Sequence, residues 1–308
     1  MAKHAPTANS APEFSVVIAT YNDWGPLNAC LRSLAEQTGA PRFEVLVVDD
    51  GSRETAPESI RAWNGQYPLT VVRQAHEGIS AARNRGVQNS RGATLVFVDA
   101  DCKLQKDCLA ALATAMAEHP QRNYFQLRLI GDCTRLVGRA EELRLIIIQK
   151  YTRQPDGCIR YLNTAGFAIR ARAEMAGEVF DPVALRGEDT LLLANLMQDG
   201  ELPWFVDHAV VQHAIPLNLW QCFLKDIRSA YLDARTYDLI AAKGVKFRFT
   251  HRERLSMLRS MWETSAQRPI GRPAWFVLAA RQALRLVMRL LTGVSGMRFH
   301  PRVEAKSS

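Results

Sequence analysis

The sequence lacks the features that define several classes of protein. Its six cysteines are scattered and form no Cys-x-x-Cys pair, so neither a zinc site nor a disulfide framework is indicated, and a reducing cytoplasm is the expected compartment. No run of apolar residues approaches the roughly 20 that a membrane-spanning helix needs. Residues 1–13 are small and polar and lack the apolar core of a signal peptide, so we expect a disordered tail.

What the chain has is length and an uneven charge. With 308 residues, 47% of them apolar, it can bury a substantial core in one large domain, with or without an appendage. The net charge is +8, but residues 243–308 carry 14 Lys and Arg against 3 Asp and Glu, so the rest of the chain is weakly acidic. Nucleic acid is not an expected partner, because no recognition module accompanies this C-terminal charge.

Apolar runs alternate with helical patterns along the chain. Buried runs of this kind, separated by helices, favour a parallel sheet covered on both faces. Strands are predicted at 14–19, 43–48, 69–72, 94–98, 124–130, 161–169 and 204–212. Helices are predicted at 23–39, 56–63, 79–89, 105–118, 139–150 and 188–198, with a mostly helical pattern from residue 217. We expect a sheet domain over residues 14–215 and a helical, basic region over residues 216–308.

Two carboxylates, Asp99 and Asp101, follow the predicted strand at 94–98. One residue apart at the end of a buried strand, they can hold a hard divalent cation through oxygen ligands. Open α/β sheets bind their ligands at this edge. The Asp-x-Asp pattern is common in loops, but here Asp49-Asp50-Gly51-Ser52 precedes it and Gly187-Glu188-Asp189 follows it.

The earlier loops of the same edge have two interpretations. Thr20-Tyr21-Asn22 and Asp49-Asp50 can be ordinary turn and capping residues. Alternatively, one aspartate accepts a hydrogen bond from the imide or amide of a nucleobase, and Tyr21 lies against that base.

A further helix is predicted to begin near Gly78 and to point its free N–H groups toward this edge, where anions are favoured. Arg83 on that helix can reach a phosphate or a neighbouring carboxylate. We interpret Arg85 as a surface residue.

Together these motifs resemble a known family. The run VVIATYND…VLVVDDGS…HEGISAARNRG…VFVDADC resembles the nucleotide-sugar half of family-2 glycosyltransferases of the GT-A fold. The likeness is close over residues 14–102 and looser as far as residue 213. It implies an α/β fold with a mostly parallel, Rossmann-like sheet, helices on both faces and a helical C-terminal extension.

The resemblance also implies roles for the edge residues. Thr20 and Tyr21 line the nucleoside pocket, and Asp49 takes the uracil edge of UDP. Asp101 is a ligand of Mg²⁺ or Mn²⁺, and Asp99 contacts the ribose or the metal. The nucleotide-binding set also includes Asn22, Asp50, Gly78 and Arg83.

The acids at 188–189 and a later histidine complete the implied site. By resemblance Asp189 is the general base and Glu188 lies on the acceptor side, whereas from the residues alone both fit helix-start acids favoured by the dipole. His213, rather than His208, is the candidate for a metal or diphosphate contact, although a lone histidine is usually structural.

The implied reaction moves one sugar from a nucleotide-sugar, expected to be a UDP-hexose, to a hydroxyl of a glycan or lipid-linked acceptor. The metal offsets charge on the leaving diphosphate, and the base accepts the proton as the anomeric carbon inverts. The Gln-x-x-Arg-Trp motif of processive relatives is absent, so transfer of a single sugar is expected.

The helical pattern at 274–291 carries Arg281, Arg285 and Arg289 at every fourth residue, which predicts one basic stripe. Such a helix can lie on an anionic membrane surface, here on the cytoplasmic face, or can pack on the preceding domain with its arginines in solvent.

Three other classes of protein share parts of this pattern. A sugar nucleotidyltransferase would carry a Gly-rich, Arg-containing loop after the first strand, where this chain has Thr20-Tyr21-Asn22-Asp23. A response-regulator receiver needs neither the Asp-x-Asp pair nor the distant Glu-Asp pair. A non-catalytic nucleotide-sugar-binding protein of the same fold is the alternative that stays open.

Overall fold

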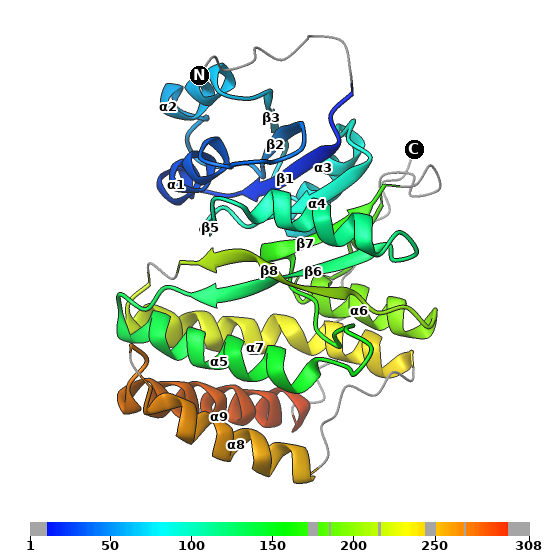
Figure 1. Cartoon of the computed structure of the whole chain (residues 1–308). Coiled ribbons are helices and arrows are strands. Elements are labelled where there is room, and N and C mark those ends of the chain that lie inside the picture. The colour runs from blue at the N-terminus through cyan, green and yellow to red at the C-terminus, as the bar shows by residue number, and fades with distance from the viewer. Residues whose placement is uncertain are drawn as a thin grey trace.

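The computed structural model describes residues 11–171, 178–184, 186–214, 217–243, 251–267 and 269–294. Most of the predicted tail lies outside these ranges. An eight-stranded sheet in the order β3-β2-β1-β4-β7-β6-β8-β5 carries helices on both faces, and three C-terminal helices form a further layer beside it (Figure 1).

The first four strands form a parallel half-sheet in the order β3-β2-β1-β4, as the apolar runs predicted. They are β1 (Phe14–Thr20), β2 (Phe43–Asp49), β3 (Leu69–Arg73) and β4 (Thr94–Phe97). The connecting helices are α1 (Trp24–Ala35), α2 (Glu58–Arg61) with a 3₁₀ turn (Ala62–Gly65), and α3 (Ile79–Gln88). The order reverses between β1 and β4, so the loops after these two strands lie at the switch point where open α/β sheets bind their ligands.

The second half of the sheet is mixed. It contains β5 (Cys102–Leu104), β6 (Tyr124–Gly131), β7 (Phe167–Arg170) and β8 (Trp204–His213). Here β7 runs antiparallel to both β4 and β6, β8 is parallel to β6, and β5 is antiparallel to β8. The helices of this half are α4 (Cys108–Glu118), α5 (Leu136–Thr152) and α6 (Glu188–Gln198).

Two predicted elements differ in the structure. The strand expected over 161–169 is limited to β7, because the Gln126 side chain occupies the backbone before it: its amide accepts from Asn163 N at 2.7 Å and donates to the Gly166 carbonyl at 2.8 Å. A 3₁₀ turn (Thr164–Gly166) follows. The helix expected over 105–118 begins only at Cys108, and the unpredicted β5 precedes it.

Side chains that alternate along the strands fill two cores. Val16, Ile18 and Val45 face the core covered by α1 and α4, whereas Val17 and Leu46 face the core covered by α3 and α6. This alternation with burial on both faces explains why the strands have no polar side.

The C-terminal layer consists of α7 (Leu219–Ala242), α8 (His251–Ser265) and α9 (Arg272–Val294). Ala274 and Leu278 of α9 pack against Leu143 and Ile147 of α5, so this layer shares a core with the rest of the molecule. Across the described residues, no helix has both the length and the apolar character required to cross a bilayer.

The arginines of α9 do not follow either predicted arrangement. Arg281 is only 8% exposed and donates from Nε to Asp226 Oδ2 of α7 at 2.6 Å. Arg285 donates to Asp226 Oδ1 from Nε at 2.9 Å. The side chain of Arg289 lies outside the described part of the chain. Two members of the stripe therefore face α7, because the buried carboxylate of Asp226 needs their charge.

Candidate active site

Asp49 and Thr20 end neighbouring strands and face each other in the sheet register. Asp49 Oδ1 accepts from Ser52 N at 2.9 Å. Within the described chain, Asp49 Oδ2 and Thr20 Oγ1 are buried without a hydrogen-bond partner, and the nearest cation to Asp49 Oδ2 is Arg73 Nε at 3.6 Å. Because buried polar atoms are normally satisfied, these two oxygens mark a place where a ligand can supply donors.

Asp50 organises the loop before α3. Its Oδ1 accepts from Glu77 N at 2.9 Å and from Gln74 Nε2 at 2.8 Å, and its Oδ2 accepts from Gly78 N at 3.0 Å. Gly78 has a φ of 95°, a conformation that favours glycine. Asp50 and Gly78 therefore belong to the framework of the loop before α3, at the C-terminal edge of the sheet.

Tyr21 and Asn22 lie at the opening of this edge. Tyr21 is exposed and stacks on the His76 ring at a centroid distance of 4.3 Å. Asn22 has a positive φ of 58°, and its backbone N–H donates to Ser52 Oγ at 2.8 Å, which ties the first loop to the second. His76 was not among the sequence candidates; its position directly before Glu77-Gly78 is the only signal that points to it.

Arg83 is buried and joins motifs that are distant in the sequence. Its Nη2 donates to Asp99 Oδ1 at 2.7 Å, and its Nη1 donates to Glu188 Oε1. The sequence suggested a phosphate or a neighbouring carboxylate as the partner of Arg83, and the structure places two carboxylates beside it. The bridge brings the Asp-x-Asp loop and the start of α6 to one side of the sheet edge.

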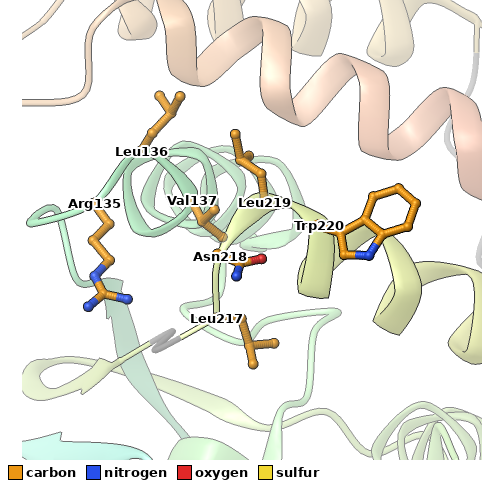
Figure 2. A pocket seen from close by; sticks show the side chains of 7 residues that line it. All are labelled: Arg135, Leu136, Val137, Leu217, Asn218, Leu219 and Trp220. Atoms are coloured by element: carbon orange, nitrogen blue, oxygen red, sulfur yellow. The ribbon is translucent and has the colours of Figure 1, made fainter.

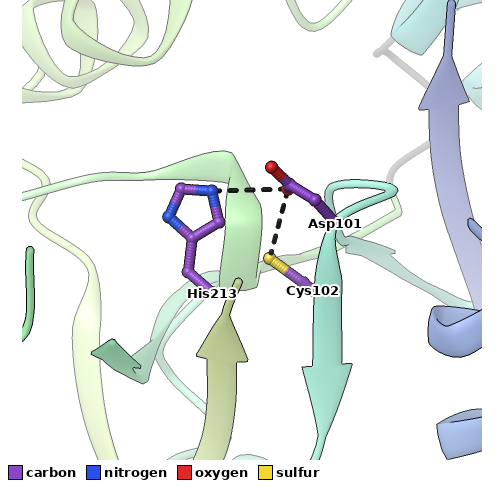
Figure 3. A group of neighbouring side chains, drawn as sticks. All are labelled: Asp101, Cys102 and His213. Carbon is purple, nitrogen blue, oxygen red and sulfur yellow. Dashed lines mark hydrogen bonds and ion pairs between the residues drawn. The ribbon is translucent and has the colours of Figure 1, made fainter. Parts of the chain in front are cut away.

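Asp101 and His213 form a candidate metal centre with Cys102 beside them (Figure 3). His213 Nε2 lies 3.3 Å from Asp101 Oδ1, because β5 pairs with β8 in a register that sets Cys102 opposite His213. Burial raises the pKa of the Cys102 thiol well above its ordinary value, and a soft sulfur ligand does not suit the hard cations that bind carboxylates. A carboxylate and an imidazole suit Mn²⁺ well.

His208 of the same strand is exposed and is not part of the group formed by Asp101, Cys102 and His213. The β6–β8 ladder has a register shift between Leu127 and Arg128. After it the pairing is regular as far as Gly131 and His213, so the end of β8 that carries His213 is held firmly in the sheet.

Charges around Asp101 and His213 stabilise the charged form of both side chains. Burial alone would raise the pKa of Asp101, but the hydrogen bond and charge of His213 lower it. Burial alone would lower the pKa of His213, but Asp101 raises it. Lys225 of α7 also lowers the pKa of Asp101. Burial, and after it the charge of Asp101, raises the pKa of Asp23. Lys225, on a distant helix, carried no sequence signal for this site.

Asp189 lies in the first turn of α6, after Gly187 in the left-handed conformation. Its Oδ1 accepts from Thr190 N at 2.6 Å. Burial and the neighbouring charge of Glu188 raise the pKa of Asp189 to about 7. A carboxyl group with this pKa is a competent proton acceptor near neutral pH.

An apolar pocket of about 480 Å³ lies where α5 and α7 begin (Figure 2). Its walls include Leu136, Val137 and Trp220, and the Trp220 side chain is 70% exposed. Asp132 N donates to the His213 carbonyl at 3.2 Å, so the loop that leads to α5 leaves the sheet beside the candidate metal centre. The pocket is therefore on the same edge as the site.

Comparison with known proteins places the chain in a family. A model of glycosyl transferase family 2 matches residues 15–174, just over half of the chain, and the chain belongs to this family. It is 33% identical over 111 residues to the uncharacterized glycosyltransferase YibD of Escherichia coli, covering 36% of this chain and 32% of that relative. It is 39% identical over 113 residues to a Mycobacterium tuberculosis PGL/p-HBAD biosynthesis glycosyltransferase, covering 36% of this chain and 44% of that relative. The chain thus matches less than half the length of either relative.

Solved structures show the same fold over nearly the whole chain. The mannosyltransferase PcManGT from Pyrobaculum calidifontis, in complex with GDP-Man and Mn²⁺, has a TM-score of 0.58 at 19% identity and covers 94% of this chain and 85% of its own. Residues 1–349 of S. aureus TarS, in complex with UDP-GlcNAc, have a TM-score of 0.51 at 18% identity and cover 92% and 91%. The GT-A α/β class is confirmed by these likenesses, which at such identities concern the fold alone.

Proposed function

We propose that this protein is an inverting, metal-dependent glycosyltransferase that moves one sugar from a UDP-sugar to a hydroxyl of a glycan or lipid-linked acceptor. The observation that carries the proposal is the Arg83 bridge. One guanidinium holds Asp99 of the metal-binding loop and Glu188, the neighbour of the candidate base, at the same edge. The bridge sets the proposed metal-binding loop and the candidate base at one edge of the sheet, which is the arrangement that sugar transfer requires.

The surroundings of Asp49 favour uracil over guanine as the base of the donor nucleotide. Asp49 has one oxygen engaged by Ser52 N, and its other oxygen is buried without a hydrogen-bond partner, 3.6 Å from Arg73 Nε. One free carboxylate oxygen matches the single imide N–H of uracil, whereas guanine presents two adjacent donors on that edge. Tyr21 and His76, which stack on each other, offer ring faces beside it. The fold accommodates both donor types, since PcManGT binds GDP-Man and TarS binds UDP-GlcNAc.

Asp101 and His213 would hold the cation, Mn²⁺ or Mg²⁺. Their donor atoms lie close enough to share one ion, and imidazole favours Mn²⁺ over Mg²⁺. The bound ion would offset the charge that develops on the diphosphate as it leaves. Asp99 has one oxygen engaged by Arg83, so its other oxygen is left for the ribose or the ion.

Asp189 is proposed to accept the proton of the acceptor hydroxyl. As that oxygen bonds to the anomeric carbon, the bond from this carbon to the diphosphate oxygen breaks on the opposite face, and the configuration inverts. A retaining route would need a second carboxylate as nucleophile. The adjacent carboxylate, Glu188, is instead held by Arg83.

The proposed setting is the cytoplasmic face of a membrane, where a lipid-linked acceptor is presented. The arginines of α9 that suggested this from the sequence face α7, so another surface has to supply the contact.

The first test is thermal stability with UDP, GDP, CMP and dTDP, each with and without Mn²⁺. A ligand that binds only the folded state adds about 2.7 kcal/mol at a hundredfold its dissociation constant. We expect stabilisation by UDP that requires Mn²⁺ and is lost in Asp101→Asn and His213→Ala. His208→Ala, an exposed change on the same strand, is the control and keeps the response.

Donor screening then follows with a UDP-sugar panel. Asp189→Asn should keep the response to UDP with Mn²⁺ and lose transfer. Transfer by Asp189→Asn at the wild-type rate would refute the base assignment, and absence of any nucleotide response would refute the donor site.

A further inference from the structure

We propose that the outer face of α8 and α9 is a docking surface for an anionic lipid bilayer. Bilayer binding is argued from the surface itself. It rests on the proposed function only for its role, which is to hold the enzyme where a lipid-linked acceptor is presented. The docking surface is defined by the exposed side chains of Leu255, Leu258, Trp262, Phe276, Leu286, Val287 and Leu291.

The helix α9 carries apolar side chains on its outer face as well as on its buried face. Ala274, Leu278 and Arg281 are buried against α5 and α7. Phe276 and Val287 lie about half a turn of the helix away from them and are 59% and 50% exposed. A surface helix normally turns its apolar stripe toward the core. Here the ion pairs to Asp226 hold Arg281 and Arg285 inward, so the outer face of α9 is left with apolar side chains.

A second apolar stripe on α8 joins the first. Leu255, Leu258 and Trp262 are spaced along one face of α8 and are all exposed, with Leu255 at 68%. The opposite face carries Met257 and Met261, which pack toward α5. Trp262 contacts Phe276 of α9 at a ring-centroid distance of 6.4 Å, so the two stripes are continuous at this corner.

Exposed cations accompany the apolar residues. Arg252, Arg254 and Arg259 are exposed on α8, and Arg272 lies over the Trp262 ring at 3.8 Å. Basic residues near an anionic bilayer each contribute about 1 kcal/mol of attraction, and tryptophan favours the interface between headgroups and acyl chains. The docking surface thus has both components of interfacial binding.

The docking surface is connected to the active-site edge. A Cβ on Gly271, the residue before α9, would lie 3.9 Å from Arg139 Nη1 in the first turn of α5. In Figure 1 the corner between α8 and α9 and the ends of β6 and β8 lie toward the same side of the molecule. A bilayer against this corner would present headgroup-linked acceptors toward that edge.

A lipid surface explains the combination better than a second copy of the chain. No helix of the described residues can span a bilayer, so contact would be interfacial. Arg252 and Arg254 are exposed beside the apolar stripe of α8, and pairing two such surfaces face to face would bring like charges together.

The test is flotation of the full-length protein with vesicles of phosphatidylcholine alone or with 30 mol% phosphatidylglycerol. We expect binding to the anionic vesicles that weakens with salt and falls at least tenfold in two double variants, Leu255→Gln/Leu258→Gln and Leu286→Gln/Val287→Gln. All four positions are exposed, so the fold should survive.

The matched control is Leu224→Gln/Ile227→Gln on α7. These residues are exposed as well, but Leu224 lies on the face of α7 opposite Asp226 and therefore points away from α9. The control should float like wild type. Each variant is also checked for the UDP and Mn²⁺ response, so loss of vesicle binding with an intact response separates this inference from the proposed function.

Three outcomes would overturn the proposal. The first is a wild-type protein that does not bind anionic vesicles, and the second is a set of α8 and α9 variants that float as wild type does. The third is a wild-type dimer, measured by light scattering, that the same variants convert to monomer, which would identify a second copy as the occupant.

Discussion

Arg83 is the side chain on which the geometry of the site depends most. Removing it would leave Glu188 buried without its cation and release Asp99. We expect Arg83→Ala to destabilise the fold by about 3 kcal/mol, the lower end of the range for a broken buried ion pair, because Asp99 is partly exposed. Thermal or denaturant unfolding measures this loss.

Two companion variants separate charge from geometry at this position. Arg85→Ala, on the exposed side of α3, should change stability by less than about 0.5 kcal/mol. Arg83→Lys keeps the charge but cannot donate in two directions from one planar group, so it should recover stability only in part and recover little transfer. Wild-type stability in Arg83→Ala would show that the bridge has no structural role.

Asp189 should make stability depend on pH. Its ordinary pKa of 3.8 is raised to about 7 in the folded protein, so ionisation is less favourable in the folded state than in the unfolded state. This penalty grows between the two pKa values and is complete above the higher one. Asp189→Asn removes it, and at 1.36 kcal/mol per pKa unit we expect a gain of at most about 4 kcal/mol at pH 8 and almost none at pH 4.

Melting curves of wild type and Asp189→Asn across this pH range provide the measurement. The rate of sugar transfer by wild type should change in the opposite direction to its stability. It should fall as the pH drops below about 7, because only the ionised carboxylate accepts a proton. A stability difference that is constant with pH would contradict the raised pKa.

At the scale of elements, α3 depends on Gly86 for its contact with the sheet. A Cβ at this position would lie 2.3 Å from Cγ1 of Val17 in β1, and a β-branched valine cannot easily move aside. Alanine gains about 1 kcal/mol in helix propensity. The clash outweighs this gain, and we expect Gly86→Ala to cost about 1–2 kcal/mol in net stability.

Gly65→Ala provides the control for this prediction. A Cβ there meets nothing within 4 Å, so unfolding should be unchanged or slightly improved. Because α3 carries Arg83, the shift in Gly86→Ala should also weaken the UDP and Mn²⁺ response. An unperturbed Gly86→Ala protein would mean that α3 can move away from β1 without loss.

Elements with a strong local pattern were predictable, and short ones were not. The apolar runs of β1, β2 and β6 were found because every residue or every second residue reports burial. The three-residue β5 has no period to detect, and it forms only because β8 lies beside it. The strand expected over 161–169 was wrong in its first part, where the Gln126 side chain replaces ladder bonds that the pattern assumes.

At the scale of the whole molecule, the C-terminal layer is part of the core. Leu143 and Ile147 of α5 are buried by residues of α9 and the turn before it. A chain that ends at Lys243 would expose them and leave Asp226 without Arg281 and Arg285. We expect this truncation to lower the melting temperature sharply or to cause aggregation.

Solubility and a melting curve of the truncated chain test this expectation. A truncation with wild-type stability would show that α8 and α9 are a separable appendage. Because truncation damages the core, point changes on exposed residues are the proper way to examine the docking surface.

The sequence by itself determined the parallel half of the sheet, the family resemblance and the positions of the acidic motifs, because these depend on local periodicity and on short spacings. Tertiary structure alone decided which charges meet. Arg83 selects two carboxylates, His213 reaches Asp101 through the pairing of β5 with β8, and Asp226 turns the arginines of α9 inward. A buried charge takes the partner that the fold brings within a few ångströms, and that distance is set by chain crossings that no local pattern records.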